Sequence, residues 1–155
     1  MSLTNQQLIF VTDRRGQLTY ANESYCNLVG YESAELLTKN IKQLTHKNMP
    51  KSVIDELSAT LSKGFSWHGV MQIKNNKQQD IWLDTFTTPQ YEQGKITGYQ
   101  SMSRVASKPL RNNAENIYSA LNKGNKWATF ELTKNHKFIF LMVISLIAQG
   151  FIYTA

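Results

Sequence analysis

Several features that would fix the class of this protein are missing from its sequence. The 155 residues include a single cysteine, Cys26, so no internal disulfide bond can form, which fits a reducing compartment. The N-terminus does not show the charged and then apolar pattern of a secretion signal. Lysine and arginine are scattered, with no basic stripe interleaved with aromatic residues, so nucleic-acid binding is weakly supported despite a formal net charge of +6.

The motifs of common catalytic sites are missing as well. No nucleophile–histidine–carboxylate spacing, glycine-rich phosphate loop or carboxylate pair is visible, and the single cysteine excludes a Cys-x-x-Cys motif. The sequence therefore gives no positive sign of an enzyme or of a metal site. Hydrophobic residues make up 41% and charged residues 18% of the chain, which is typical of a globular protein. The length of 155 residues indicates one domain and a small further segment.

Short strands and helices alternate in the first part of the chain. The apolar run 8–12 and the stretch 18–21 predict a hairpin around the turn 13–16. Asn22 is placed to cap a helix that ends at Gly30. Two short helices are predicted next, one capped by Ser33 and one over 41–44. A longer helix is predicted from Pro50 to Gly64, and its buried face consists of Val53, Ile54, Leu57 and Leu61.

Three strands joined by short polar turns then predict an antiparallel meander. Trp67 lies on the first, Trp82 on the second over 81–87, and the third covers 96–103 after a tight turn at 91–95. Simple alternation places the side chains of His68 and Trp67 on opposite faces of their strand. Together with the hairpin, these strands predict an α+β domain whose five-stranded antiparallel sheet has helices on one face.

The chain changes character after the third meander strand. Apolar residues at helical spacing predict an amphipathic connector helix within 107–124 that packs on the sheet or pairs with a second copy. The stripe consists of Leu110, Ala114, Ile117, Tyr118 and Leu121. Residues 125–137 read as a polar linker.

The last stretch, 138–155, is uncharged and apolar on all sides. A helix of this length reaches about 27 Å, and the hydrocarbon core of a bilayer is about 30 Å thick, so a transmembrane segment is predicted. A buried helix of a soluble protein is the alternative. Lys134 and Lys137 flank the stretch, which by the positive-inside tendency places the preceding domain in the cytoplasm.

A series of motifs resembles the PAS domain of the bacterial aerotaxis receptor family, in the same order along the chain. Residues 20–25 with Gly30 and Tyr31 resemble the general PAS core pattern. The more specific matches are residues 46–50, residues 63–69, Trp82, residues 94–99 and residues 120–124. The resemblance covers roughly 8–124, so a PAS domain is expected over 8–106, and it continues into a membrane anchor.

This resemblance implies a PAS sensor that binds FAD non-covalently and reports the redox state of the electron-transport chain to a chemotaxis kinase. It further implies a cytoplasmic sensory domain anchored to the inner membrane, a homodimer, and a downstream signalling region of the same receptor. By position, Asn22, His46 and Trp67 match residues tied to flavin binding in the family. Thr45 stands where the family has Arg and Asn48 where it has Asp, and threonine cannot replace the bidentate contacts of arginine.

The departures leave room for another ligand, such as haem bound through His46, or for a ligand-free signalling module. The candidate cofactor-binding residues are Asn22, Thr45, His46, Asn48, Trp67 and Trp82. Several have a structural alternative: helix capping for Asn22, an exposed loop position for His46, and core packing for both tryptophans, which is favoured for Trp82. Cys26 is expected to be a small helix residue, because the segment of light-sensing PAS domains that carries a reactive cysteine is missing.

Overall fold

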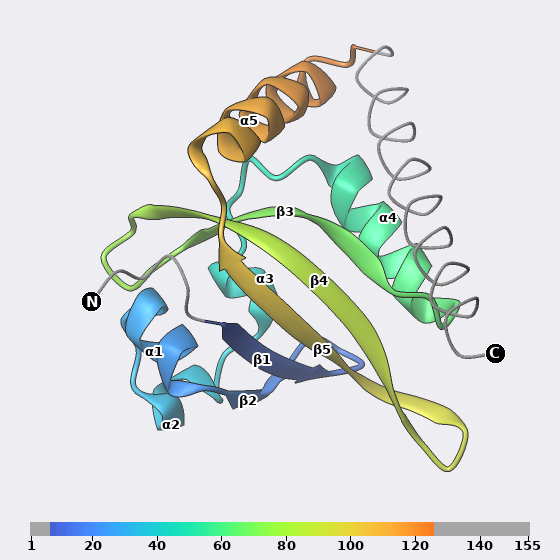
Figure 1. Ribbon diagram of the computed structural model, residues 1–155. Coiled ribbons are helices and arrows are strands. Elements are labelled where there is room, and N and C mark those ends of the chain that lie inside the picture. The colour runs from blue at the N-terminus through green and yellow to red at the C-terminus, as the bar shows by residue number, and fades with distance from the viewer. Residues whose placement is uncertain (1–6, 126–155) are drawn as a thin grey trace, which may run out of the picture. The chain divides into compact units, whose positions relative to one another are not determined.

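The computed structural model describes residues 7–125, and its elements follow one another as predicted (Figure 1). The strands are β1 (Leu8–Asp13), β2 (Leu18–Ala21), β3 (Trp67–Lys74), β4 (Asp80–Glu92) and β5 (Lys95–Val105). The helices are α1 (Glu23–Val29), α2 (Ser33–Leu36), α3 (Ile41–Leu44), α4 (Lys51–Ser62) and α5 (Lys108–Asn122).

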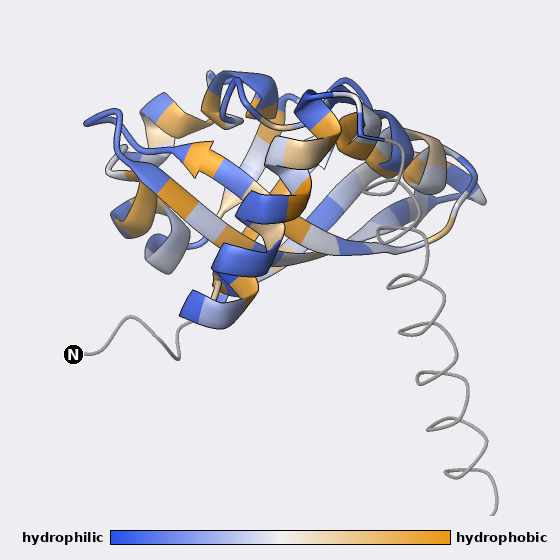
Figure 2. Ribbon diagram, turned by 90° about the horizontal axis from the view of Figure 1, so that it is seen from above, coloured by the Kyte–Doolittle hydropathy of each residue, from blue (hydrophilic) through white to orange (hydrophobic). Residues whose placement is uncertain are grey.

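The strands form one antiparallel sheet in the order β2-β1-β5-β4-β3, which confirms the predicted five-stranded sheet. The N-terminal hairpin joins the meander through β1, which pairs with β5 along its whole length. Hydrophobic and hydrophilic residues alternate along the strands (Figure 2), so the two faces of the sheet differ in chemistry. The central strands β5 and β4 therefore place neighbouring residues in two different environments.

One face of the sheet, called here the inner face, packs against the short helices α1, α2 and α3. Its core members pack with residues of α1, α2 and α3 in one buried cluster. The buried residues of this cluster are Leu8, Phe10, Leu18, Tyr25, Cys26, Val29, Leu36, Leu44, Ile73 and Leu83. The opposite side, the outer face, carries the alternate residues of the same strands. Cys26 is a buried helix residue, and burial, as the largest cause, raises the pKa of its thiol.

Two predicted boundaries were wrong. Ser33 was expected to cap α2, but Glu32 holds the cap position with an extended backbone, because the Leu36 N–H already bonds the Glu32 carbonyl. Strand β4 continues well past the predicted end at residue 87 and passes through Pro89. The pairing of β3 ends opposite Thr87, so Pro89 has a neighbouring strand on one side only, a situation in which strands tolerate proline.

The connector helix forms as α5 within the predicted range. Ala114 and Tyr118 are buried, and Leu110, Ile117 and Leu121 are partly buried, whereas most of the residues between them are exposed. Within residues 7–125 no helix is long and apolar enough to cross a bilayer. The predicted membrane segment 138–155, and all of the predicted linker beyond Asn125, lie outside the described residues.

Candidate functional site

The centre of the inner face carries small hydroxyl residues where a core strand would ordinarily carry Leu, Ile or Val. Thr85 and Thr87 of β4 lie directly opposite Ser103 and Ser101 of β5 in the strand register. All four are buried, with exposed fractions between 3% and 5%. We call these four residues the hydroxyl patch, and it sits on the two strands at the middle of the sheet.

The hydroxyl patch is held together by hydrogen bonds between its own side chains. The Thr85 and Ser103 hydroxyl oxygens lie 3.0 Å apart, and those of Thr87 and Ser101 lie 2.9 Å apart. Either hydroxyl of each pair can donate, because a hydroxyl group is both a donor and an acceptor. One bond uses only one of the two hydroxyl hydrogens, so each pair keeps a second donor.

Trp67 and Gly69 border the hydroxyl patch on the β3 side. They pair with Thr87 and Thr85 respectively, and Trp67 is only 2% exposed. A Cβ atom added at Gly69 would lie 2.4 Å from the Trp67 indole, so the ring lies over this glycine. Glycine is therefore required here by the tryptophan, and the pair forms a flat aromatic edge beside the patch.

Phe10 and Tyr25 border the hydroxyl patch on the β1 side. Phe10 pairs with Ser101, and the Tyr25 ring lies 4.8 Å from the Phe10 ring between centroids. The Tyr25 hydroxyl is completely buried and has no hydrogen-bond partner among residues 7–125. Burial raises the pKa of this phenol well above its usual value, so it remains a neutral donor. The Tyr25 hydroxyl thus adds one more unused buried donor to the two that the hydroxyl pairs leave.

Asn22 has a structural role in this fold. Its side-chain oxygen accepts hydrogen bonds from the Tyr25 and Ile9 backbone N–H groups at 3.0 and 3.1 Å, and its amide donates to the Gln7 carbonyl at 2.9 Å. The residue thus caps α1 and fastens it to β1. Its predicted role in cofactor binding stays a prediction.

His46 lies beside the edge strand β3, where its backbone N–H donates to the Gln72 carbonyl at 2.9 Å, and at 6% exposure it is not the exposed loop residue of the structural alternative. Its Nδ1 accepts the Asn48 backbone N–H at 3.0 Å, so Nε2 carries the proton, and Nε2 lies 3.5 Å from the Asp80 carboxylate. Nδ1 is thus occupied by the Asn48 N–H and Nε2 faces the Asp80 carboxylate, and haem binding through His46 stays a prediction. The Lys74 ammonium, and more weakly His46, hold the pKa of the Asp80 carboxyl below its usual value.

Of the remaining predicted site residues, Thr45 and Asn48 flank His46 in the chain, and Trp82 lies on β4. The Thr45 hydroxyl donates to the Ile41 carbonyl at 3.0 Å, and Asn48 is exposed. Trp82 pairs with Gln72 on the outer side of the sheet, because its neighbour Leu83 belongs to the inner core. Of the six predicted cofactor-binding residues, Trp67 alone borders the hydroxyl patch.

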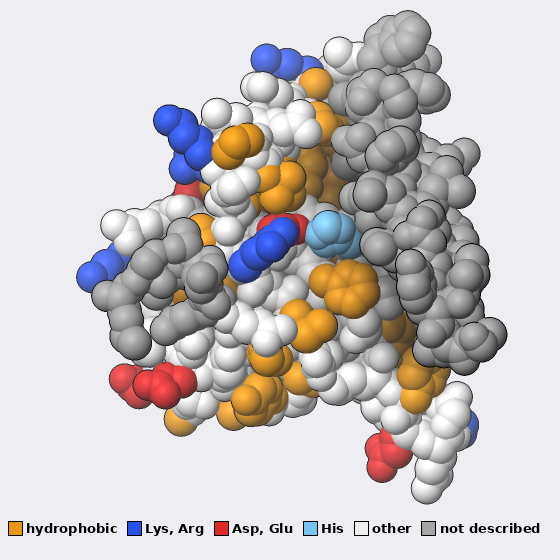
Figure 3. All heavy atoms as spheres, viewed as in Figure 1, with side chains coloured by type: hydrophobic (Ala, Val, Ile, Leu, Met, Phe, Trp, Pro, Cys, Tyr) orange, Lys and Arg blue, Asp and Glu red, His pale blue; other side chains and the backbone are white. Residues whose placement is uncertain are grey.

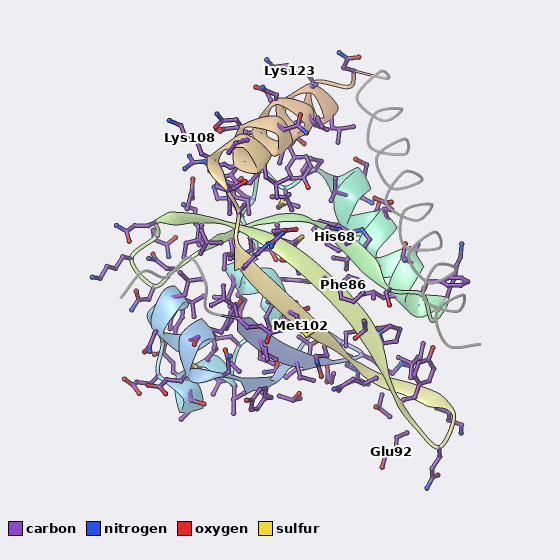
Figure 4. The ribbon with its side chains drawn as sticks, in the orientation of Figure 1. His68, Phe86, Glu92, Met102, Lys108 and Lys123 are labelled. Atoms are coloured by element: carbon purple, nitrogen blue, oxygen red, sulfur yellow. The ribbon has the colours of Figure 1, made fainter. Side chains whose placement is uncertain are left out.

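The outer face of the same strands carries an ionic cluster. The buried Asp84 carboxylate accepts from Arg104 Nε at 2.9 Å and lies 2.7 Å from His68 Nε2. Figure 3 shows charged and histidine side chains next to a hydrophobic area, and Figure 4 shows His68, Phe86 and Met102 on neighbouring strands. His68 therefore faces away from Trp67, as predicted.

Sequence reasoning missed the hydroxyl patch, although a signal for it exists. Thr-x-Thr at 85–87 and Ser-x-Ser at 101–103 place small hydroxyl residues at every second position of two predicted strands. This period of two puts both members of each motif on one face of the sheet. The register that brings the two motifs opposite each other could not be deduced from the sequence.

Comparison with known proteins agrees with this architecture. Residues 18–103 match the family described as PAS fold. The chain is 30% identical over 117 residues to the aerotaxis receptor of Escherichia coli (strain K12), covering 76% of this chain and 23% of the receptor. It is 33% identical over 101 residues to a nitrogen fixation regulatory protein of Klebsiella pneumoniae, covering 64% of this chain and 20% of that protein. The chain thus spans about a fifth of each relative.

Solved structures show the same fold. A light-oxygen-voltage domain studied with a flavin analogue superimposes with a TM-score of 0.63 at 19% identity, covering 79% of this chain and 90% of that one. A PAS domain from Colwellia psychrerythraea gives a TM-score of 0.58 at 22% identity, covering 66% and 87% of the two chains. At these identities the likeness concerns the fold.

Proposed function

This chain belongs to the PAS family, and from that premise we propose that it is the sensory part of a longer aerotaxis-type transducer, with FAD bound against the inner face of the sheet. The aerotaxis receptor and the flavin-associated light-oxygen-voltage domain are among the proteins it resembles. These proteins suggest a flavin as the class of ligand. Whether a flavin fits this chain depends on the residues of its inner face.

The observation that carries the proposal is the buried hydroxyl patch. Each hydroxyl pair forms one internal hydrogen bond and keeps one unused donor, and unused hydrogen-bonding capacity in a buried place costs free energy, so a ligand with acceptor groups would satisfy the patch more fully. A flavin ring is flat and carries carbonyl acceptors along one edge, which suits small side chains with unused donors. The unpartnered Tyr25 hydroxyl nearby points to the same kind of ligand.

Different residues of the inner face would have different roles in binding FAD. Thr85, Thr87, Ser101 and Ser103 would hydrogen-bond the ring edge, and the indole of Trp67 would exclude water beside it. When bound, FAD supplies reversible electron uptake. Ser101 and Ser103 lie on β5, which only two residues separate from α5, so a change in their hydrogen bonds would be passed along the chain to the connector helix.

The rest of the signalling route belongs to the same proposal. Membrane anchoring through 138–155, homodimerisation, a cytoplasmic position at the inner membrane, and transfer of the signal through a downstream region to a chemotaxis kinase follow from the resemblance to the aerotaxis receptor. Roles for Asn22, Thr45, His46 and Asn48 toward more distant parts of FAD also stay proposals.

The purified full chain should contain FAD. The test is a visible spectrum before and after reconstitution, followed by acid extraction and chromatography that distinguishes FAD from FMN and haem. We expect a flavin spectrum and about one FAD per chain. A preparation that stays colourless after reconstitution contradicts the proposal, and a haem spectrum replaces it with a different sensor.

A further inference from the structure

We propose that the two Thr–Ser pairs of the hydroxyl patch form a reversible hydrogen-bond element that stabilises the reduced ring more than the oxidised one. The inference rests on the proposed binding of FAD and goes beyond it. It assigns the preference between redox states to Thr85, Thr87, Ser101 and Ser103, and to no charged residue.

The first step is the count of hydrogen-bond donors. Each pair has two hydroxyl hydrogens, and the bond between its members uses one of them. Among residues 7–125 these four hydroxyls make no other side-chain hydrogen bond. Two donors are therefore left at the centre of the inner face, in a region from which water is largely excluded.

The second step is the effect of such donors on a ring that takes up electrons. Fixed donors in a low-dielectric site stabilise an electron-rich group more strongly than a neutral one. Reduction also adds N–H groups to a flavin, and a hydroxyl can rotate to accept from them. A neutral hydroxyl thus serves both redox states without moving the backbone, but it favours the reduced state.

The hydrogen bonds of the hydroxyl patch connect the two central strands. Each pair bridges β4 and β5, since Thr85 faces Ser103 and Thr87 faces Ser101 in the register. A hydroxyl that donates its hydrogen to the ring must accept in the bridging bond, whereas a hydroxyl that accepts from the ring can donate its hydrogen to its partner. A change in redox state therefore changes the direction of a bond between the two central strands.

The experiment compares midpoint potentials of the flavin-loaded full chain. Thr87→Val with Ser101→Ala, and Thr85→Val with Ser103→Ala, each remove one pair while keeping side-chain size nearly constant. Thr88→Val, on the same strand but on the outer face, is the matched control. Each double variant should shift the binding ratio of the two redox states about tenfold toward the oxidised ring, which lowers the potential by about 30 mV for a two-electron couple.

A second readout covers the case of poor folding. The single variants Thr87→Val and Ser101→Ala should each raise the carbonyl stretching frequency of the bound flavin, because a donor to the ring is lost. Flavin that stays bound with unchanged potential and unchanged carbonyl frequency in all variants overturns the inference, while the proposed function stands. Wild-type protein that takes up no flavin overturns the proposed function, and this inference with it.

Discussion

The two faces of the central strands β4 and β5 differ in how their buried polar side chains are paired. On the inner face Thr85 bonds Ser103, both neutral and buried, whereas on the outer face the next residues along, Asp84 and Arg104, form an ion pair beside solvent. Inside the core, the desolvation penalty of an ion pair can exceed the electrostatic free energy that the pair gains. A pair of neutral hydroxyls has a smaller desolvation penalty and keeps a spare donor. This difference is the reason why we propose the inner pairs as a ligand site, whereas the outer ion pair connects β4 to β5.

The largest effect is expected when a larger side chain fills the inner face, because this tests whether the ligand binds there. Ser101→Leu places a branched side chain where the ring must lie, and we expect flavin affinity to fall by about 100-fold, since overpacking costs up to about 3 kcal/mol. The measurement is a flavin titration followed by fluorescence. Met102→Leu, one residue along and facing outward, is the control and should bind flavin normally. Equal losses in both variants would contradict a ligand on the inner face.

The aromatic border of the inner face provides the next test. Gly69→Ala forces the buried Trp67 ring to move, because the new Cβ would lie 2.4 Å from it, and should reduce the free energy of unfolding by about 2 kcal/mol. Urea denaturation measures this loss. Adding Trp67→Phe to Gly69→Ala should recover part of it, because the smaller ring leaves room for the methyl group. A Gly69→Ala variant as stable as wild type would show that the ring does not lie over the glycine.

The outer cluster should affect stability without affecting the ligand. Asp84→Asn weakens the bonds to both Arg104 and His68, and should lower the free energy of unfolding by about 1–2 kcal/mol. The cost stays moderate because the Arg104 side chain is 73% exposed and is rehydrated. Flavin affinity and midpoint potential should not change. A shifted potential would mean that the outer charges reach the ligand, and the separation of the two faces would fail.

The smallest expected effect concerns Asp80 at the start of β4. Because Lys74, and more weakly His46, lower the pKa of its carboxyl, its contribution to stability is present above the unfolded-state pKa of about 4 and is lost as pH falls through the folded-state value. Melting temperatures at pH 7 and pH 3 should therefore differ less in Asp80→Asn than in wild type. High salt should reduce this difference, because the Asp80 side chain is 43% exposed. An identical pH dependence would contradict the assignment.

The sequence predicted the architecture better than the site. The five strands, the cap at Asn22, the stop at Gly30 and the orientation of His68 follow from local rules that the structure bears out. Those rules depend on neighbouring residues or on a period of two or 3.6. The site depends on register, since Thr87 and Ser101 are 14 residues apart and meet only because the hairpin aligns them.

The predicted site residues also show how little residue type alone says about a ligand site. The role of His46 toward a ligand stays a prediction; in the structure its ring lies against Asp80 and the Asn48 N–H, and Trp82 lies on the other face of the sheet from Trp67. Residue type alone cannot distinguish a polar group that fastens a loop from one that meets a ligand. The distinguishing property is unused hydrogen-bonding capacity in a buried place, which only the structure provides.

The most direct test of this account is the position of the bound ring. Nuclear Overhauser effects between the methyl groups of flavin and the isotope-labelled full chain report which side chains lie within a few ångström of the ring. We expect contacts with the methyl groups of Thr85 and Thr87 and with the Trp67 indole, and none with Met102 or Phe86. Contacts with the outer-face residues, or a bound flavin without contacts to either threonine, would contradict it.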